Sequence, residues 1–165
     1  MSDPMETVNP IPLDYPQVTP YLSVAGAAAA VEFYTQVFGA VERMRMPGPG
    51  DTIGHCEMQL GASLSMRADE APDIGFLSPK TLGGTPVIIS VYVTDVDSVF
   101  ARAVQAGATV VRQLENQFYG DRSGQVEDPW GHRWSIASRV EEIPPEEMAR
   151  RAAEASAAAG GNPAG

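Results

Sequence analysis

The sequence predicts an α+β fold made of two βαβββ repeats. The order of one strand, one helix and three strands occurs twice, over residues 17–67 and again over 87–138. The helical pattern of each repeat stops at a glycine, Gly39 or Gly107, as the C-terminal caps of helices do. The strand segments alternate apolar and polar residues, which is typical of a sheet with one buried face.

The first repeat contains four predicted strands and one helix. Residues 18–24 alternate as a strand does, and residues 27–38 have the apolar spacing of a helix. The later strands of this repeat are expected at 40–46, 53–60 and 63–67. The PGPGD turn after the first of these lacks the Gly-Lys-Ser/Thr ending of a phosphate-binding loop, so we assign it no ligand.

The second repeat follows a linker at residues 68–86 that contains proline, glycine and aspartate. It begins with a strand at 87–94 and a helix at 95–106, which Asp95 is expected to cap. Three further strands are expected at about 109–113, 122–127 and 133–138. Residues 61–66 lie over 131–136 with a shift of 70, which supports an internal repeat.

The two ends of the chain are expected to lie outside the domain of residues 17–138. Residues 1–16 contain four prolines and no periodicity, which predicts a flexible N-terminal arm. Residues 139–165 are expected to form a helix that begins at Pro144 and Pro145 and then a disordered tail from about residue 159.

The composition restricts the partners and the compartment. The chain has 21 acidic and 11 basic residues and a net charge of −10, so nucleic acid and anionic membrane surfaces are not expected partners. Its single cysteine, Cys56, excludes an intrachain disulfide and agrees with a reducing compartment. No signal-peptide pattern or run of ~20 apolar residues is present, so we expect a cytoplasmic protein.

The polar faces of the strands supply the candidate binding residues. Two interpretations are open: a solvated sheet surface, or a sheet that curls into a cup around a ligand. The mixture of tyrosine, histidine, glutamate and arginine favours a binding site, and two arginines would suit an anionic or carbonyl-bearing ligand. The residues predicted to bind the ligand are Tyr21, His55, Glu57, Arg67, Tyr92, Arg133 and Ser135.

His55 and Glu57 could also carry chemistry. Their spacing of two on one strand suits a hydrogen-bonded wall or, as an alternative, part of a metal site. Glu57 is the best available general base if the cup raises its pKa, so it is our candidate catalytic residue. Cys56 points to the opposite, apolar face and is expected to be inert.

The segment EDPWGHRWSIA, residues 127–137, gathers many functional side chains around a turn. We interpret Asp128-Pro129-Trp130-Gly131 as the turn itself. Trp134 is expected to face the core, and His132 to be structural or exposed. Arg133 is the member expected to contact a ligand.

Four segments carry a resemblance to a known family: PYLSVAGAAAAVEFYTQVFGA, GHCEMQLGASLSM, VYVTDVDSVFARAVQAGA and FYGDRSGQVEDPWGHRWSIA. Over residues 17–150 they resemble the vicinal oxygen chelate (glyoxalase, bleomycin resistance, dioxygenase) superfamily, and more narrowly its PhnB-like branch. The resemblance implies a U-shaped, cupped mixed sheet with helices on its outer face. It also implies a homodimer, in which the repeats pair within one chain or are exchanged between chains.

Metal-dependent members of that superfamily hold a divalent ion on four strand side chains. Similarity to glyoxalase I places those positions at Thr19, Ser65, Ile88 and Ser135. None of these is a usual ligand of a divalent metal, so we expect no metal and no cofactor.

Three functions follow as hypotheses. The first is a metal-free protein that binds a small molecule in a dimer cup, and the second is a lyase- or dioxygenase-type enzyme. The enzyme would use a non-standard metal or Glu57 as a general base. The third is a scaffold subunit without a ligand.

Overall fold

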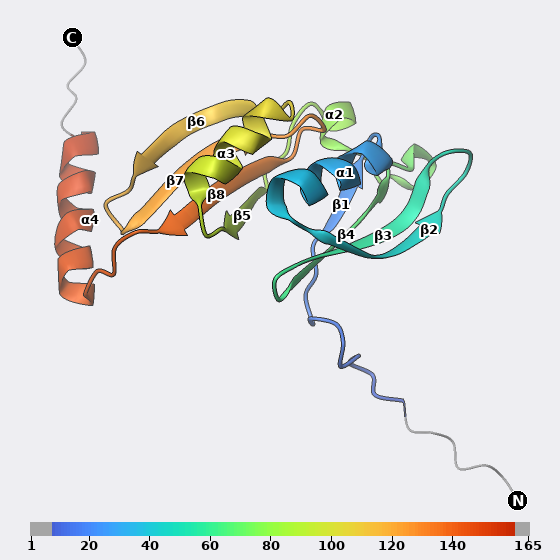
Figure 1. The fold of residues 1–165 in the computed structure, drawn as a ribbon, viewed down its shortest axis with the longest axis horizontal. Helices are drawn as coiled ribbons and strands as arrows, with labels where there is room; N and C mark the ends of the chain where they lie inside the picture. Colours follow the sequence, from blue (N-terminus) through green and yellow to red (C-terminus); the bar gives the residue numbers. More distant parts are fainter. Residues whose placement is uncertain (1–7, 161–165) are drawn as a thin grey trace, which may run out of the picture. The chain divides into compact units, whose positions relative to one another are not determined.

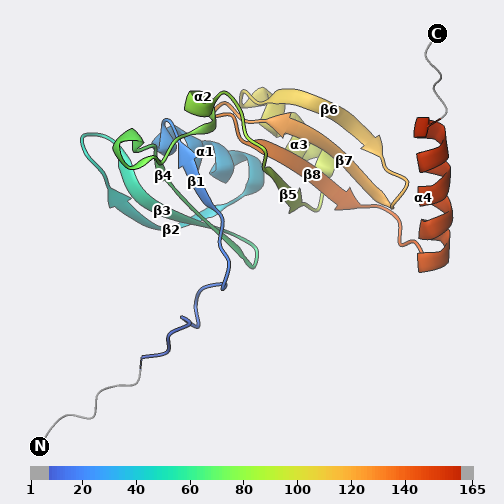
Figure 2. The ribbon, with the colours of Figure 1, turned by 180° about the vertical axis from the view of Figure 1, so that it is seen from behind.

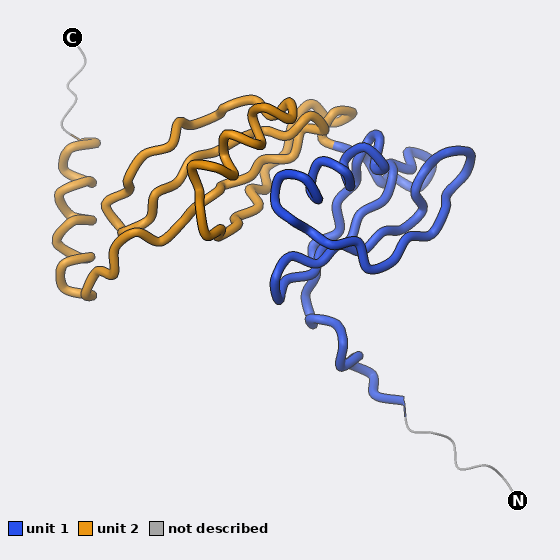
Figure 3. The backbone as a smooth tube through the Cα atoms, in the orientation of Figure 1, with its two compact units in different colours: residues 1–78 blue, residues 79–165 orange. Residues whose placement is uncertain are grey.

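The computed structural model describes residues 8–160, and the chain forms two compact units, residues 1–78 and 79–165 (Figures 1 and 3). The elements of the first unit are β1 (Tyr21–Val24), α1 (Ala27–Phe38), β2 (Val41–Pro47), β3 (Ile53–Leu60), β4 (Ser63–Asp69) and the 3-10 helix η1 (Pro72–Ile74). Those of the second are α2 (Pro79–Leu82), β5 (Ile88–Tyr92), α3 (Val96–Gln105), β6 (Thr109–Asn116), β7 (Asp121–Glu127), β8 (Arg133–Arg139) and α4 (Pro145–Gly160).

Each unit contains one four-stranded mixed sheet. The strand orders are β1-β4-β3-β2 and β5-β8-β7-β6. The first strand of each repeat pairs in parallel with the last, and the other pairs are antiparallel. The predicted α+β class with two βαβββ repeats is therefore confirmed.

One helix covers one face of each sheet. In Figure 1, α1 and α3 each lie in front of the sheet of their own unit, and in Figure 2 they lie behind it. The apolar side chains of α1 recur at helical spacing and are buried, among them Val31, Tyr34 and Phe38. Gly39 ends this helix with a φ of 71°, a left-handed conformation that glycine adopts without strain.

Helix α3 of the second unit has the predicted cap and a close contact with its sheet. The Asp95 carboxylate accepts a hydrogen bond from the Ser98 backbone N–H at 3.1 Å. The ring of Phe100 packs on Gly124 of β7, where an added Cβ would lie 2.6 Å from Cε2 of that ring. Glycine at this position therefore lets α3 lie against the strand.

A side chain at the end of the last strand holds the start of each repeat's helix. The Asp69 carboxylate accepts from the Ala27 N–H at 3.1 Å, and the Ser138 hydroxyl accepts from the Val96 N–H at 3.1 Å. Ala27 and Val96 are 69 positions apart, as are Asp69 and Ser138. The structural repeat therefore has an offset of 69 in these strands.

The offset of 70 predicted for residues 61–66 is wrong by one residue. β3 and β4 are joined by a two-residue turn between paired Leu60 and Ser63, whereas residues 128–132 separate paired Glu127 and Arg133. Alignment on the turn glycines therefore shifted the strand that follows. As a consequence, Met66 and not Ser65 is the counterpart of Ser135.

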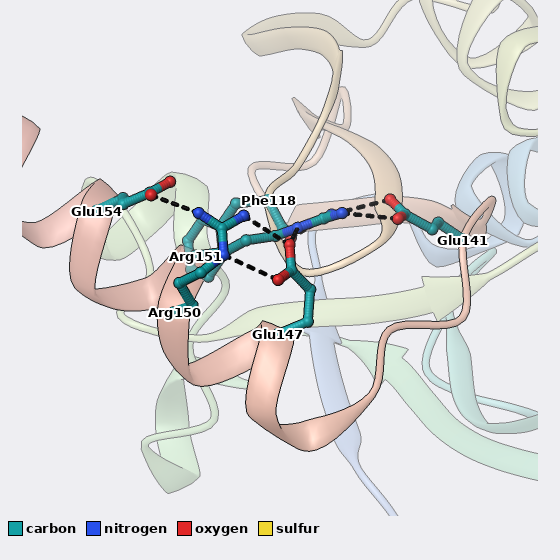
Figure 4. Close-up of polar contacts among 6 residues, drawn as sticks. All are labelled: Phe118, Glu141, Glu147, Arg150, Arg151 and Glu154. Carbon is teal, nitrogen blue, oxygen red and sulfur yellow. Dashed lines mark hydrogen bonds and ion pairs between the residues drawn. The ribbon is translucent and has the colours of Figure 1, made fainter.

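The C-terminal helix α4 is joined to the second unit through charged residues (Figure 4). Arg151 donates hydrogen bonds to the Glu141 carboxylate at 2.8 and 2.9 Å and to the Phe118 carbonyl at 3.3 Å. Hydrogen bonds from Arg150 and Arg151 lower the pKa of Glu147 to about 2. The helix continues through residue 160, past the predicted start of the tail, and residues 161–165 lie outside the described part of the chain.

The described part of the N-terminal arm begins at residue 8, and no helix within residues 8–160 is long and apolar enough to cross a membrane. The predicted linker at 68–86 contains the end of β4 together with η1 and α2.

Candidate functional site

Three of the predicted binding residues form a hydrogen-bonded chain in unit 1. The Tyr21 hydroxyl lies 2.6 Å from Nδ1 of His55, and Nε2 of His55 lies 3.2 Å from Oε1 of Glu57. The strands place them together because His55 and Glu57 alternate on one face of β3, and β1 is separated from β3 only by β4. The sequence prediction that these three side chains share a face is confirmed by these contacts.

Glu57 is buried, with 3% of its surface exposed, and yet it favours the ionised state. Burial is the largest single influence and opposes ionisation, but hydrogen bonds from Tyr15 and His55, together with electrostatic attraction to His55 and Arg43, lower the pKa of Glu57. The condition under which Glu57 was the candidate general base, a raised pKa, is therefore not met, because two hydrogen-bond donors reach the carboxylate.

Tyr15 is a member of the site that sequence reasoning missed. Its hydroxyl donates to both carboxylate oxygens of Glu57, at 2.8 and 3.0 Å. The Arg43 guanidinium lies 5.5 Å from the centre of the Tyr15 ring, a distance that suits a cation–π contact. The only signal was an aromatic residue between prolines just before the first strand, in a segment we had assigned to the N-terminal arm.

Apolar side chains, mainly methionines, surround the hydrogen-bonded row of Tyr21, His55 and Glu57. Residues paired across neighbouring strands point to the same face, and this places Met44 beside Glu57, Met46 beside His55 and Met66 beside both Glu57 and Tyr21. Phe76 meets the Tyr21 ring edge-on with 5.5 Å between ring centres. We call this surface the Glu57 face; its members are Tyr21, Met44, Met46, His55, Glu57 and Met66.

Arg67 does not belong to the Glu57 face, which corrects the prediction. It pairs with Leu22 and Cys56 across the sheet, and its guanidinium lies 4.5 Å from the centre of the Tyr34 ring of α1. Only 1% of its surface is exposed. The polarity of β4 misled the prediction because Leu64 and Met66 were taken as the core side of that strand.

The remaining predicted residues lie in unit 2 and share a face there. Ser90 pairs with Ser135, and Tyr92 and Arg133 lie at positions of the same parity on β5 and β8. The Tyr92 hydroxyl donates to Asp121 at 2.6 Å, which raises the pKa of Tyr92. Arg133 is half-exposed and lies 3.7 Å from the Glu127 carboxylate.

The middle of the EDPWGHRWSIA segment, residues 128–132, is a structural turn between β7 and β8. The Asp128 carboxylate is 2% exposed and accepts hydrogen bonds from the N–H groups of Trp130 and His132, both at 3.0 Å. It also accepts one from the indole N–H of Trp134 at 2.9 Å. His132 is buried, and Trp134 faces the core as predicted. Gly131 has a φ of 89°, which the turn requires.

The residues at the superfamily metal positions do not fit a divalent ion. The corrected register replaces Ser65 with Met66 in the inherited set, and Ser65 instead accepts a hydrogen bond from Arg67 on the α1-covered face. His55 and Glu57 contact each other directly, and within residues 8–160 no three His, Cys, Asp or Glu side chains group as metal ligands would. We therefore derive no chemistry through a metal. Cys56 is fully buried, and that burial raises its pKa.

A hollow of about 450 Å³ lies elsewhere on unit 1, between α1 and β2. Its walls include Val31, Thr35, Val41 and an exposed pair in which Arg45 donates to Glu42 at 2.6 Å. Its lining residues include no histidine or cysteine, and its carboxylates, Glu32 and Glu42, are exposed. The Glu57 face, with its buried carboxylate and histidine, is the stronger candidate site.

Comparisons with known proteins agree with this fold. The Glyoxalase/Bleomycin resistance protein/Dioxygenase superfamily matches residues 15–136. An uncharacterized protein of Mycobacterium bovis is 44% identical over 136 residues, which cover 81% of this chain and 90% of the relative. Among solved structures, TioX from Micromonospora is 26% identical with a TM-score of 0.58, covering 78% of this chain and 100% of that chain. A gene product of Arabidopsis thaliana is 27% identical with a TM-score of 0.61, covering 74% and 98%.

Proposed function

We propose that this chain, a member of the glyoxalase/bleomycin resistance protein/dioxygenase superfamily, binds a small molecule on the Glu57 face without a metal ion. The observation that carries the proposal is a hydrogen-bonded row in which Tyr15 and His55 contact the buried carboxylate of Glu57 and Tyr21 contacts His55. Burying an ionised carboxylate costs free energy unless several donors satisfy it, and a fold has no need to place such a group on a sheet face. Perturbed, partnered side chains of this kind gather at functional sites.

The apolar part of the Glu57 face supports a small organic ligand. Methionine side chains adapt their shape to irregular apolar groups, and Met46 is half exposed beside the polar chain. Ligand sites commonly combine such walls with a few polar groups that fix the orientation of the ligand. The ligand we propose therefore carries one polar end, which lies beside Tyr21, and an apolar body.

An enzyme is the second candidate function, and one observation favours it. A phenol, an imidazole and a carboxylate linked in a row by hydrogen bonds form an arrangement that can transfer a proton. A merely retained ligand needs hydrogen bonds but not a buried charge behind them.

Native mass spectrometry of the freshly purified chain tests the proposal. We expect a retained small molecule and no stoichiometric metal. Elemental analysis after dialysis that finds near-stoichiometric Zn, Ni, Mn or Fe would overturn the metal-free part. Amide NMR with a panel of small carbonyl compounds should move the signals of Tyr21, His55 and Glu57, and compounds that move only residues of α1 would contradict the proposed face.

We further propose a homodimer and membership of the PhnB-like branch. β5 is an edge strand of its sheet. Ile88 and Tyr92 of this strand, and Val87 just before it, expose apolar surface. A second copy of the chain is the proposed cover for this edge. Light scattering at micromolar concentration should give the mass of a dimer, and a monomer would contradict the proposal. The proposed branch is supported by the resemblance of four sequence segments within residues 17–150.

A further inference from the structure

Glu57 is the carboxylate of the site, but it is poorly placed to contact a ligand. Both of its oxygens accept hydrogen bonds from Tyr15, and Oε1 also faces His55. With 3% of its surface exposed, Glu57 lies behind its partners. The role of a direct general base, which the sequence suggested for Glu57, does not suit this geometry.

Tyr21 is at the opposite end of the hydrogen-bonded row from Glu57 and is 45% exposed. Between the two, His55 makes one contact with each of its ring nitrogens, Nδ1 with Tyr21 and Nε2 with Glu57. The chain therefore runs from an accessible hydroxyl to a buried carboxylate, with an imidazole that can hold a proton in the middle.

With a neutral His55, only one arrangement of protons satisfies all three groups. An ionised Glu57 can only accept, so Nε2 of His55 carries the imidazole proton and donates it. Nδ1 of His55 then has a free lone pair and accepts from the Tyr21 hydroxyl. The Tyr21 oxygen is left with its lone pairs toward the ligand side, where it can accept but cannot donate.

We propose that Tyr21, His55 and Glu57 form a general-base relay in which Tyr21 takes a proton from a weakly acidic ligand. The ligand class is an apolar ketone, aldehyde or phenol with an ionisable C–H or O–H bond. This inference rests on the proposed function, because it needs a ligand on the Glu57 face.

The proton balance of the step is complete without a co-reactant. The C–H or O–H bond of the ligand breaks and leaves its electron pair on the ligand. A new O–H bond forms at Tyr21 while its former proton moves to Nδ1 of His55. The products are the ligand anion and an imidazolium, which the Glu57 carboxylate stabilises through Nε2–H, as in other relays of a hydroxyl, an imidazole and a carboxylate. Glu57 is in this scheme a positioning residue.

Nitrogen NMR of the imidazoles in the ligand-free full chain tests the proton arrangement directly. The chain has two histidines, so His55→Gln identifies the signals of His55, and His132 reports on folding. At neutral pH we expect the proton of neutral His55 on Nε2. A proton on Nδ1 would overturn the relay even if small molecules bind at the Glu57 face.

Exchange of the α-protons of cyclohexanone in D2O tests the chemistry. The wild-type chain should accelerate exchange, and Tyr21→Phe should lower that acceleration by about 10²-fold, the size of a general-base contribution. Tyr119→Phe is the matched control, because Tyr119 lies in a turn of unit 2 outside the site, and it should exchange as wild type does. Equal rates for wild type and Tyr21→Phe would overturn the relay.

Glu57→Gln separates positioning from folding. It should lower the exchange rate while the dissociation constant of cyclohexanone, measured by saturation-transfer NMR, stays within about twofold of wild type, a split that a structural role would not give. Binding without any exchange rejects the relay and leaves the proposed function intact. The expected proton on Nε2 together with no cyclohexanone binding counts against the proposed function.

Discussion

The carboxylate of Asp128 is expected to stabilise unit 2 through hydrogen bonds that it accepts from Trp130, His132 and Trp134. Its Oδ1 atom accepts from two backbone N–H groups and its Oδ2 atom accepts from Trp134 Nε1, all within 3.0 Å. We predict that Asp128→Ala lowers the free energy of unfolding by about 3–5 kcal/mol, because each buried donor that loses its acceptor costs about 1–3 kcal/mol. The value is below the sum of three full losses because water can reach part of a surface turn.

Asp128→Asn is the sharper substitution, because it keeps the shape of the side chain and opposes two donors at the Trp134 indole. Its amide oxygen can still accept from the two backbone N–H groups, but its NH2 group then faces the indole N–H of Trp134. We predict a loss of about 1–3 kcal/mol. In a Trp134→Phe background the opposed donors are gone, so the same substitution should cost at least ~1 kcal/mol less.

Urea unfolding measured by far-ultraviolet circular dichroism and by tryptophan fluorescence is the assay. Both probes are needed because the chain has two compact units, which can unfold separately. If Asp128→Asn is as stable as wild type, or costs the same with and without the indole, the hydrogen-bond account is refuted. Ligand binding on the Glu57 face should be unchanged in the folded Asp128→Asn variant.

Four further substitutions concern charged side chains. Hydrogen bonds hold the pKa of Glu57 below its ordinary value, so the ionised carboxylate stabilises the folded state at pH values above the unfolded-state pKa. This contribution is lost as the pH falls through the lower pKa of the folded state. Glu57→Gln should therefore make the free energy of unfolding less dependent on pH in the acid range. Arg133→Ala should weaken the binding of a ligand that contacts Arg133 by about 1.5–3 kcal/mol. Arg67→Met should lower the stability of unit 1 and leave the dissociation constant of a ligand on the Glu57 face unchanged, as titration calorimetry can show. Arg151→Ala should raise amide hydrogen exchange in α4 while the rest of unit 2 keeps its protection, because this residue joins α4 to Glu141 and the Phe118 carbonyl.

The helices and most strands could be predicted because their signals are local. The predicted helix at 27–38 has the observed bounds of α1, and the strand at 53–60 has those of β3. Apolar spacing, a terminal glycine and strict alternation all act within a few residues, so no tertiary information is needed to read them.

The phase of β4 could not be predicted, because it depends on a distant partner. An arginine in a strand pattern indicates a solvent-facing position, since buried guanidinium groups are rare. Here the ring of Tyr34 on α1 lies over the Arg67 guanidinium and makes a buried position possible. Tyr15 was missed for a related reason, because its only partner in the site, Glu57, is 42 positions away along the chain.

The second repeat provides an internal comparison that bears on the role of the Glu57 face. Met66 and Ser135 are counterparts, and their partners across the neighbouring strand are Glu57 and Gln125. By the same registers, Tyr21 corresponds to Ser90 and His55 to Ser123. Unit 2 thus builds the same four-stranded sheet with small or neutral residues at all three positions.

Because the sheet forms without the phenol, the imidazole and the carboxylate in unit 2, folding does not require them in unit 1. We therefore predict that the chain with Tyr21→Ser, His55→Ser and Glu57→Gln together keeps its far-ultraviolet circular dichroism spectrum and a cooperative thermal transition, and loses ligand binding at the Glu57 face. The three single variants, measured for folding and for ligand binding in the same way, are the controls for an indirect effect of any one substitution. A triple variant that does not fold would show that the three residues serve the architecture of unit 1, and one that folds and still retains the ligand would place the binding site elsewhere.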